Sequence, residues 1–132
     1  MKILLHGASG VMGKNVQEVA SEHPDCSIVA GVDRGIHAEE SSAFPVYSDI
    51  QKVKEDFDVI IDFSVKEAVD ALLAFAVEKK KALVLCTTGL SETQLEKIEE
   101  AGRTIPILQS GNMSLGINVL EELLRIAAGK LY

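Results

Sequence analysis

Apolar residues along the chain follow two alternating patterns. Short, nearly continuous apolar runs predict buried strands at Lys2–His6, Ser27–Asp33, Pro45–Tyr47, Asp58–Ser64, Ala82–Gly89 and Ile105–Gly111. Between the runs, apolar residues recur at every third or fourth position. This spacing predicts helices from Val11 to about Glu22, at Asp49–Glu55, Val65–Lys80 and Ser91–Gly102, and from Leu115 to about Ala128. Arg34–Phe44 is polar and is predicted to be a loop.

The alternation of strands and helices determines the predicted fold class. Strands joined through helices by short linkers run parallel and connect by right-handed crossovers. Because the strands are apolar throughout rather than at every second residue, both faces of the sheet are expected to be covered. We therefore predict a Rossmann-like, doubly wound α/β fold of three layers, in one domain spanning residues 1–132. Ligands of such sheets bind at the carboxyl ends of the strands.

Three glycines, Gly7, Gly10 and Gly13, lie between the first strand and the first helix. In a dinucleotide-binding turn the first makes the turn, the next lets backbone approach a pyrophosphate, and the last lets helix and strand pack closely. Asp33, 20 residues after Gly13, ends the second strand and can accept hydrogen bonds from a ribose. The spacing is GxxGxxG rather than GxGxxG, so Ala8 or Ser9 must supply the close approach. A turn that needs glycine for packing alone is the alternative.

Two neighbouring residues leave the choice between NADH and NADPH open. The Asp33 carboxylate favours the 2′-hydroxyl of NAD, whereas the guanidinium of Arg34 can pair with a 2′-phosphate or stack on adenine. Arg34 can equally be an ordinary solvated charge after a strand.

Three further segments lie at the ends of predicted strands, on the same rim. CTTG, residues Cys86–Gly89, offers two hydroxyls where the nicotinamide half is expected. SGNMS, residues Ser110–Ser114, offers an amide side chain, and DFS, residues Asp62–Ser64, ends the fourth strand. Strand-end hydrogen bonds are the alternative for the two threonines, and Ser114 is expected to cap a helix.

Composition and charge narrow the class of partner. The chain has 132 residues, of which 47% are hydrophobic, and a net charge of -7. That charge argues against a nucleic-acid or anionic-membrane partner. The two cysteines lie in apolar runs and no signal-peptide pattern is present, so a cytoplasmic protein is expected. The three histidines are too scattered to predict a metal site, and Cys86 is expected to be a small buried residue.

These motifs resemble, in order and over nearly the whole chain, the N-terminal nucleotide-binding domain of the dihydrodipicolinate reductase (4-hydroxy-tetrahydrodipicolinate reductase) family. The matching segments are GASGVMGK, the Asp33–Arg34 pair, DFS, CTTG and GNMSLGINV. The glycine turn is generic, whereas TTG followed by NMSxGxN is specific. The resemblance implies hydride transfer from NADH or NADPH to a cyclic imine dicarboxylate in bacterial lysine and diaminopimelate biosynthesis.

The resemblance also implies which residues contact the cofactor. They are Gly7, Ala8, Ser9, Gly10, Val11, Met12, Asp33, Arg34, Cys86, Thr87, Thr88, Ser110, Gly111, Asn112 and Met113. Two positions depart from the family pattern. Cys86 stands where glycine or alanine is common, and Gly111 where alanine or proline is usual. Both changes are small, so backbone contacts are expected to survive, although Cys86 can crowd the carboxamide end.

Family members continue into a substrate domain that holds the dicarboxylate, supplies the acid and builds a homotetramer. Its His-His-x-x-Lys motif and Ser-Gly-Thr segment do not occur in these residues. We therefore expect an isolated or truncated cofactor domain that binds a pyridine dinucleotide, has no catalytic residue of its own and does not turn over alone. The alternatives are a stand-alone dinucleotide-binding or redox-sensing module, and the cofactor domain of an aspartate- or homoserine-type dehydrogenase. The GNMSLG turn favours the reductase over the latter.

Overall fold

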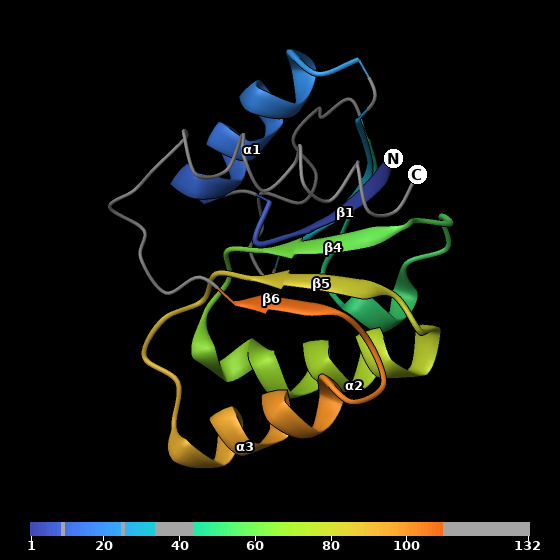
Figure 1. The fold of residues 1–132 in the computed structure, drawn as a ribbon. Coiled ribbons are helices and arrows are strands. Elements are labelled where there is room, and N and C mark those ends of the chain that lie inside the picture. Colours follow the sequence, from blue (N-terminus) through green and yellow to red (C-terminus); the bar gives the residue numbers. More distant parts are fainter. Residues whose placement is uncertain (9, 25, 34–43, 110–132) are drawn as a thin grey trace.

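A six-stranded parallel sheet with the strand order β3-β2-β1-β4-β5-β6 forms the centre of the molecule (Figure 1). The computed structural model describes residues 1–8, 10–24, 26–33 and 44–109. The strands are β1 (Lys2–His6), β2 (Ser27–Val32), β3 (Val46–Tyr47), β4 (Val59–Asp62), β5 (Ala82–Leu85) and β6 (Ile107–Gln109). This strand order is that of a dinucleotide-binding doubly wound sheet, so the predicted fold class is confirmed.

Helices cover both faces of the sheet. In Figure 1, α1 lies on one side and α2 and α3 lie together on the other. The helices are α1 (Val11–Ser21), α2 (Val69–Lys79) and α3 (Glu92–Ala101), with short 3-10 helices η2 (Ile50–Lys52) and η3 (Lys66–Ala68). The described part of the chain therefore has the predicted three layers.

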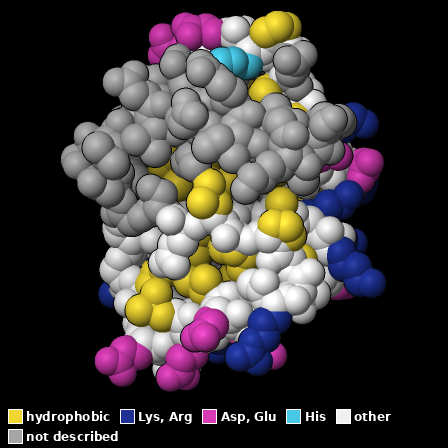
Figure 2. All heavy atoms as spheres, viewed as in Figure 1, with side chains coloured by type: hydrophobic (Ala, Val, Ile, Leu, Met, Phe, Trp, Pro, Cys, Tyr) yellow, Lys and Arg dark blue, Asp and Glu magenta, His cyan; other side chains and the backbone are white. Residues whose placement is uncertain are grey.

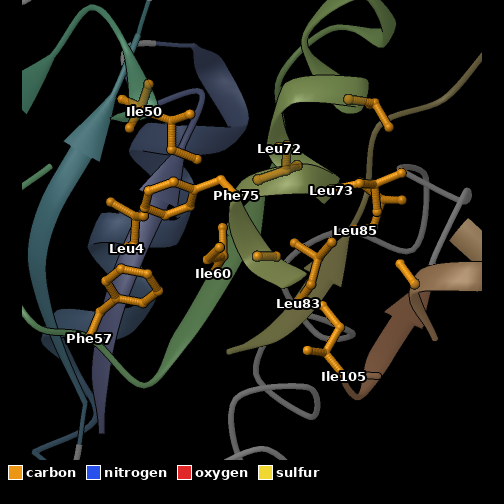
Figure 3. Packing of buried hydrophobic residues seen from close by; sticks show 14 of the residues in the cluster. Leu4, Ile50, Phe57, Ile60, Leu72, Leu73, Phe75, Leu83, Leu85 and Ile105 are labelled. Carbon is orange, nitrogen blue, oxygen red and sulfur yellow. The ribbon is translucent and has the colours of Figure 1, made fainter. Parts of the chain in front are cut away.

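The hydrophobic core is divided by the sheet because successive side chains of a strand point to opposite faces. In β1, Ile3 and Leu5 pack with Val16 on the α1 side, whereas Leu4 packs with Leu72 on the α2 side. Figure 3 shows the larger cluster, between the sheet and α2. All five of these side chains are fully buried, which explains why the strands read as continuous apolar runs.

The ends of several elements differ from the prediction. Helix α2 begins at Val69, four residues later than predicted, because Val65 is extended and η3 intervenes. The helix predicted at Asp49–Glu55 is only the 3-10 turn η2, whose start is capped by the Asp49 side chain. The strand predicted at 82–89 is shorter, as β5, and β6 begins at Ile107, two residues later than predicted, while residues 110 and 111 lie outside the described residues. The capping box at Ser91 and Gln94 is confirmed. The last predicted helix lies outside the described residues.

Figure 2 shows hydrophobic side chains in the middle of the face seen in Figure 1, with acidic and basic side chains along its foot, over α3. Among the described residues, the exposed large hydrophobic side chains are Val65, Leu95 and Leu108. No helix of the described part is long and apolar enough to span a lipid bilayer.

Candidate functional site

A cleft of about 690 Å³ opens at the carboxyl ends of the strands. Its walls come from the end of β1 and the glycine turn, the end of β2, the segment after β3, and the segment from β4 into α2. The lining residues are His6, Gly7, Gly10, Val32, Asp33, Ser48, Asp49, Ile50, Phe63, Ser64, Val65, Glu67, Ala68 and Ala71. Strand β1 lies between β2 and β4, where the strand order reverses, and this is where a doubly wound sheet binds its ligand.

The fold itself requires two of the three glycines in the turn. Gly7 has a φ of +88°, and a Cβ atom there would lie 2.6 Å from the carbonyl oxygen of Phe63. A Cβ atom at Gly13 would lie 2.6 Å from the carbonyl oxygen of Ala8 and would overlap that of Gly7. No side chain fits at either position without movement of the backbone. Gly7 therefore makes the turn and Gly13 lets α1 pack against it, as predicted from the spacing.

Gly10 is different, because nothing within the described structure requires a glycine there. Its φ of -74° suits any residue, and a Cβ atom would lie 3.6 Å from the nearest atom, the carbonyl oxygen of Gly7. The residue is exposed and lines the cleft. Packing alone therefore explains Gly7 and Gly13 but not Gly10, whose missing side chain leaves room for a group that enters the cleft from outside.

The same residue is the N-cap of α1. The first-turn N–H groups of α1 have no partner inside the helix, Gly10 has no side chain to cap them, and no acidic residue lies in the first turn. The N-terminus of a helix carries a partial positive charge and binds anions. The turn is held against β2, since the N–H groups of Gly7 and Ala8 donate to the Val32 carbonyl at 2.8 and 3.2 Å. The cleft thus presents the N-terminus of α1 on a turn that hydrogen bonds hold in place, an arrangement suited to an anion.

The side chain of Ala8 does not take part in that site. Ala8 is 2% exposed, and a Cβ atom added to Gly31 would lie 2.8 Å from the Ala8 Cβ. Its side chain therefore faces the packed interface between the turn and β2. Ser9, the other residue predicted to supply the close approach, lies outside the described residues.

A second part of the cleft wall combines a carboxylate with apolar side chains. Asp33 follows β2, lines the cleft, and is tied to β3 by its backbone N–H, which donates to the Tyr47 carbonyl at 2.8 Å. Ile50, Ala68 and Ala71 form the apolar part of this wall. A flat aromatic base with a sugar attached matches such a wall. Arg34 lies outside the described residues, so the choice between NADH and NADPH stays a prediction.

The strongest polar cluster of the site is centred on Asp62, at the end of β4. This carboxylate is fully buried and accepts hydrogen bonds from His6 Nδ1 at 2.8 Å, the Ser64 backbone N–H at 3.0 Å and the Thr87 hydroxyl at 2.5 Å. The Ser64 hydroxyl donates to it at 2.5 Å. Burial alone raises the pKa of Asp62, but the His6 hydrogen bond and charge, with the two hydroxyls, outweigh burial and hold that pKa below its ordinary value.

Sequence reasoning placed Asp62, Ser64 and Thr87 on one rim but did not join His6 to them. The register of the sheet joins them: His6 lies directly opposite Asp62 in the pairing of β1 with β4. All four residues stand at carboxyl ends of adjacent strands. The sequence did contain a signal for this cluster, because His6, Asp62 and Thr87 each stand at the end of an apolar run.

The CTTG segment divides between core and surface. Cys86 is buried, and burial, with the charge of Asp62, raises the pKa of its thiol to about 12. Cys86 is thus the small buried residue expected from the sequence. The hydroxyl of Thr87 is bound to Asp62, which fits the strand-end alternative for that residue, and Thr88 is exposed. Ser110–Met113 lie outside the described residues.

Within the described ranges, no three His, Cys, Asp or Glu side chains gather in a way that could hold a metal ion. The chemistry that the cleft offers is anion binding at a helix N-terminus beside a carboxylate and an apolar wall.

Comparison with known proteins identifies close relatives. Residues 1–113 match the family described as "Dihydrodipicolinate reductase, N-terminus". A 4-hydroxy-tetrahydrodipicolinate reductase of Caldanaerobacter subterraneus subsp. tengcongensis is 48% identical over 128 residues, which are 97% of this chain and 50% of that protein. One of Clostridium tetani is 41% identical over 132 residues, 100% of this chain and 51% of the relative. The chain spans about half the length of the curated relatives it matches.

Solved structures share the fold. A dipicolinate-bound dihydrodipicolinate reductase from a Paenisporosarcina species superimposes with a TM-score of 0.75 at 18% identity, covering 97% of this chain and 53% of that one. An Agrobacterium radiobacter oxidoreductase in complex with NAD+, L-tartaric acid and magnesium gives a TM-score of 0.67 at 18% identity, covering 96% and 40%. At these identities the likeness concerns the fold.

Proposed function

This chain belongs to the dihydrodipicolinate reductase family, to whose N-terminal part it corresponds, and we propose that it is the NAD(P)H-binding half of a 4-hydroxy-tetrahydrodipicolinate reductase. The observation that carries the proposal is Gly10. It is a glycine that the described fold does not require, at the uncapped N-terminus of α1, facing a cleft large enough for a nucleotide. A glycine at this position is explained if the backbone there lies directly against a pyrophosphate, because a side chain would keep the two apart.

The cleft suggests how the dinucleotide lies. The turn from Gly7 to Gly10, with the first N–H groups of α1, would hold the pyrophosphate. The Asp33 carboxylate would accept a hydrogen bond from a ribose hydroxyl of the adenosine half, and Ala68 and Ala71 would offer an apolar surface to the adenine. The nicotinamide half runs the other way, toward the ends of β4 and β5. This direction follows from the strand order, because β2 lies on one side of β1 and β4 on the other.

The proposed contacts are the set predicted from the sequence. Gly7, Gly10 and Asp33 line the cleft, and the backbone of Ala8 in the turn and of Val11 and Met12 in the first turn of α1 is proposed to contact the pyrophosphate. Cys86–Thr88 end β5 on the nicotinamide side, where backbone groups and the exposed Thr88 can meet the carboxamide. Ser9, Arg34, Ser110, Gly111, Asn112 and Met113 complete the proposed set outside the described residues.

In the complete enzyme the bound cofactor supplies a hydride to a cyclic imine dicarboxylate. Relatives are about twice as long as this chain, so we assign the groups that bind and protonate the substrate to their other half. The same half is proposed to build a homotetramer, and the enzyme is proposed to act in the cytoplasm, without a nucleic-acid or membrane partner. The net charge of -7 supports the last point.

The direct test is titration of the chain with NADH and with NADPH by isothermal calorimetry. We expect saturable binding of at least one of them, with a dissociation constant between the low-micromolar and millimolar ranges. No saturation by either at millimolar concentration contradicts the proposal. The ratio of the two affinities gives the cofactor preference. The Asp33 carboxylate favours NADH, and the Arg34 guanidinium favours NADPH.

A further inference from the structure

His6 is a buried histidine in the wall of the proposed cofactor cleft. The residue is 6% exposed and follows Leu5 at the end of β1, immediately before the glycine turn. It lines the cleft beside Gly7 and Ser64. A polar ring in such a place is costly unless its nitrogens have partners.

Only one of the two ring nitrogens has a partner in the described part of the chain. Nδ1 lies 2.8 Å from Oδ1 of Asp62, and Nε2 makes no hydrogen bond with any described residue. Nδ1 is turned to the carboxylate within the sheet, so the nitrogen that the ring can offer to the cleft is Nε2. The ring cannot turn away without breaking the bond to Asp62.

Asp62 also fixes the tautomer of the ring. An ionised carboxylate only accepts hydrogen bonds, so Nδ1 carries a hydrogen and donates it. Nε2 is then an acceptor in the neutral ring and a donor in the protonated ring. Asp62 is itself held by Ser64 and Thr87, so the ring is oriented by a network that spans three strands.

We propose that His6 is a dinucleotide-binding residue, whose Nε2 hydrogen-bonds an oxygen on the adenosine side of the bound cofactor, and that Asp62 is its positioning residue. This rests on the proposed function of the cleft. The adenosine side is indicated because the cleft walls beyond His6 include Asp33, Ile50 and Ala71, whereas Thr88 is not among them. Ribose hydroxyls and phosphate oxygens are the oxygens found on that side.

A purely structural role is the competing explanation, since the His6–Asp62 bond also ties β1 to β4. The two roles use different nitrogens and can be separated. His6→Asn places an amide near the position of Nδ1, where it can still donate to Asp62, and removes Nε2. His23→Asn is the matched control, because it makes the same change in the connection between α1 and β2, away from the cleft.

The experiment measures NADH affinity by calorimetry and thermal unfolding for the wild type and both variants. We expect His6→Asn to unfold within a few degrees of the wild type but to bind NADH about three- to tenfold more weakly. One uncharged hydrogen bond is worth about that factor. His23→Asn should match the wild type in both measurements. Equal NADH affinity of His6→Asn and wild type overturns the proposal.

A measurement on the wild type covers the case in which His6→Asn does not fold. Nitrogen-15 NMR of the imidazole rings reports each ring nitrogen separately. Addition of NADH should shift the Nε2 resonance of His6 and leave that of His23 in place. A His6 resonance that does not move at saturation overturns the proposal, because a purely structural tie does not sense the ligand at Nε2.

Smaller ligands distinguish the two oxygen sources. Adenosine has the ribose hydroxyls without phosphate, and ADP has both. A His6 shift with adenosine assigns the contact to a hydroxyl, and a shift with ADP alone assigns it to a phosphate. A shift with nicotinamide mononucleotide only overturns the adenosine-side assignment.

Should the wild type bind NADH while His6 is unaffected, the proposed function stands and this inference alone fails. Should it not bind NADH, both fail.

Discussion

Gly10 and its neighbours in the turn show how one residue type serves two purposes. At Gly7 and Gly13 the protein's own carbonyl groups occupy the space of a side chain, so glycine is a condition of folding. At Gly10 no described atom comes closer than 3.6 Å to the position of a Cβ atom and the backbone is ordinary, so the described fold gives no reason for a glycine, and the proposed ligand does. The GxxGxxG spacing alone does not tell which glycines the fold requires and which a ligand requires. The structure separates the two groups, and Gly10 is the one for which a ligand is the proposed reason.

Replacing Gly10 by Val tests that statement. We expect folding to cost at most about 1 kcal/mol, the scale of an N-cap change. Dinucleotide affinity should fall at least tenfold, because the isopropyl group occupies the place of the pyrophosphate. Calorimetry with NADH and chemical unfolding measure the two effects. Gly13→Ala is the contrasting variant, and it should fail to fold stably because its methyl group overlaps two carbonyls. Unchanged NADH affinity of Gly10→Val would show that the open space has no ligand.

At the scale of elements, Asp62 joins three strands at the edge where the ligand binds. Asp62 is the last residue of β4. Its carboxylate accepts hydrogen bonds from His6, at the end of β1, and from Thr87, which follows β5. Backbone pairing already holds these strands, but pairing does not fix the side chains at their ends. The buried carboxylate of Asp62 fixes those side chains, because it accepts hydrogen bonds from donors on three elements. Removing its charge leaves those donors without an acceptor of the same strength.

The charge of Asp62 should therefore appear in the acid stability of the fold. Because its folded pKa lies below the ordinary value of about 3.9, it stabilises the fold above that pH and loses this contribution as pH falls through the folded pKa. At pH 5, Asp62→Asn should be about 1–3 kcal/mol less stable than the wild type. The difference should shrink steadily as pH falls below about 4.

Urea unfolding at a series of pH values measures that difference. Asp56→Asn is the control, since the Asp56 side chain is 78% exposed and its pairing with Lys81 at 3.6 Å is a surface contact. It should differ little from the wild type at any pH. A wild-type advantage over Asp62→Asn that is constant, or grows, below pH 4 would contradict the ionised role of Asp62.

The helices and strands could be predicted from the sequence more fully than the contacts between side chains of different strands. The strands β1, β4 and β5 were predictable because they are buried on both faces, and the start of α3 because Ser91 and Gln94 form a local capping box. The start of α2 was predicted too early, since nothing local marks Val65 as extended. The pairing of His6 with Asp62 joins residues 56 positions apart, and depends on a strand register that no local pattern encodes.

At the scale of the whole molecule, the described lining of the cleft offers backbone N–H groups for a pyrophosphate but no Lys or Arg side chain for the carboxylates of a substrate. Asp33, Asp49 and Glu67 all line it, and the chain has a net charge of -7. Of the proposed nicotinamide-side groups, the Thr87 hydroxyl is bound to Asp62 and Thr88 is neutral. Relatives about twice as long have room elsewhere for the cations that a dicarboxylate needs.

We therefore expect this chain to bind cofactor without turning over on its own. Hydride transfer needs the imine carbon held about 3–3.5 Å from the nicotinamide, and such positioning supplies several kcal/mol of the barrier. It also needs a proton donor for the nitrogen and cations for two carboxylates. Among the described residues, the exposed Lys66 has its side chain 4.0 Å from the Cβ position of Gly89, but one ammonium group cannot meet both needs.

The assay follows NADH and NADPH absorbance after addition of freshly prepared imine dicarboxylate. The full-length Caldanaerobacter relative serves as the positive control under identical conditions. For the present chain we expect no multiple turnovers, even at cofactor concentrations that calorimetry shows to be saturating. Because saturation is established separately, a negative result reflects missing substrate groups rather than missing cofactor. Turnover at about 1 per second or faster, the range of ordinary enzymes, would place the catalytic groups within these 132 residues.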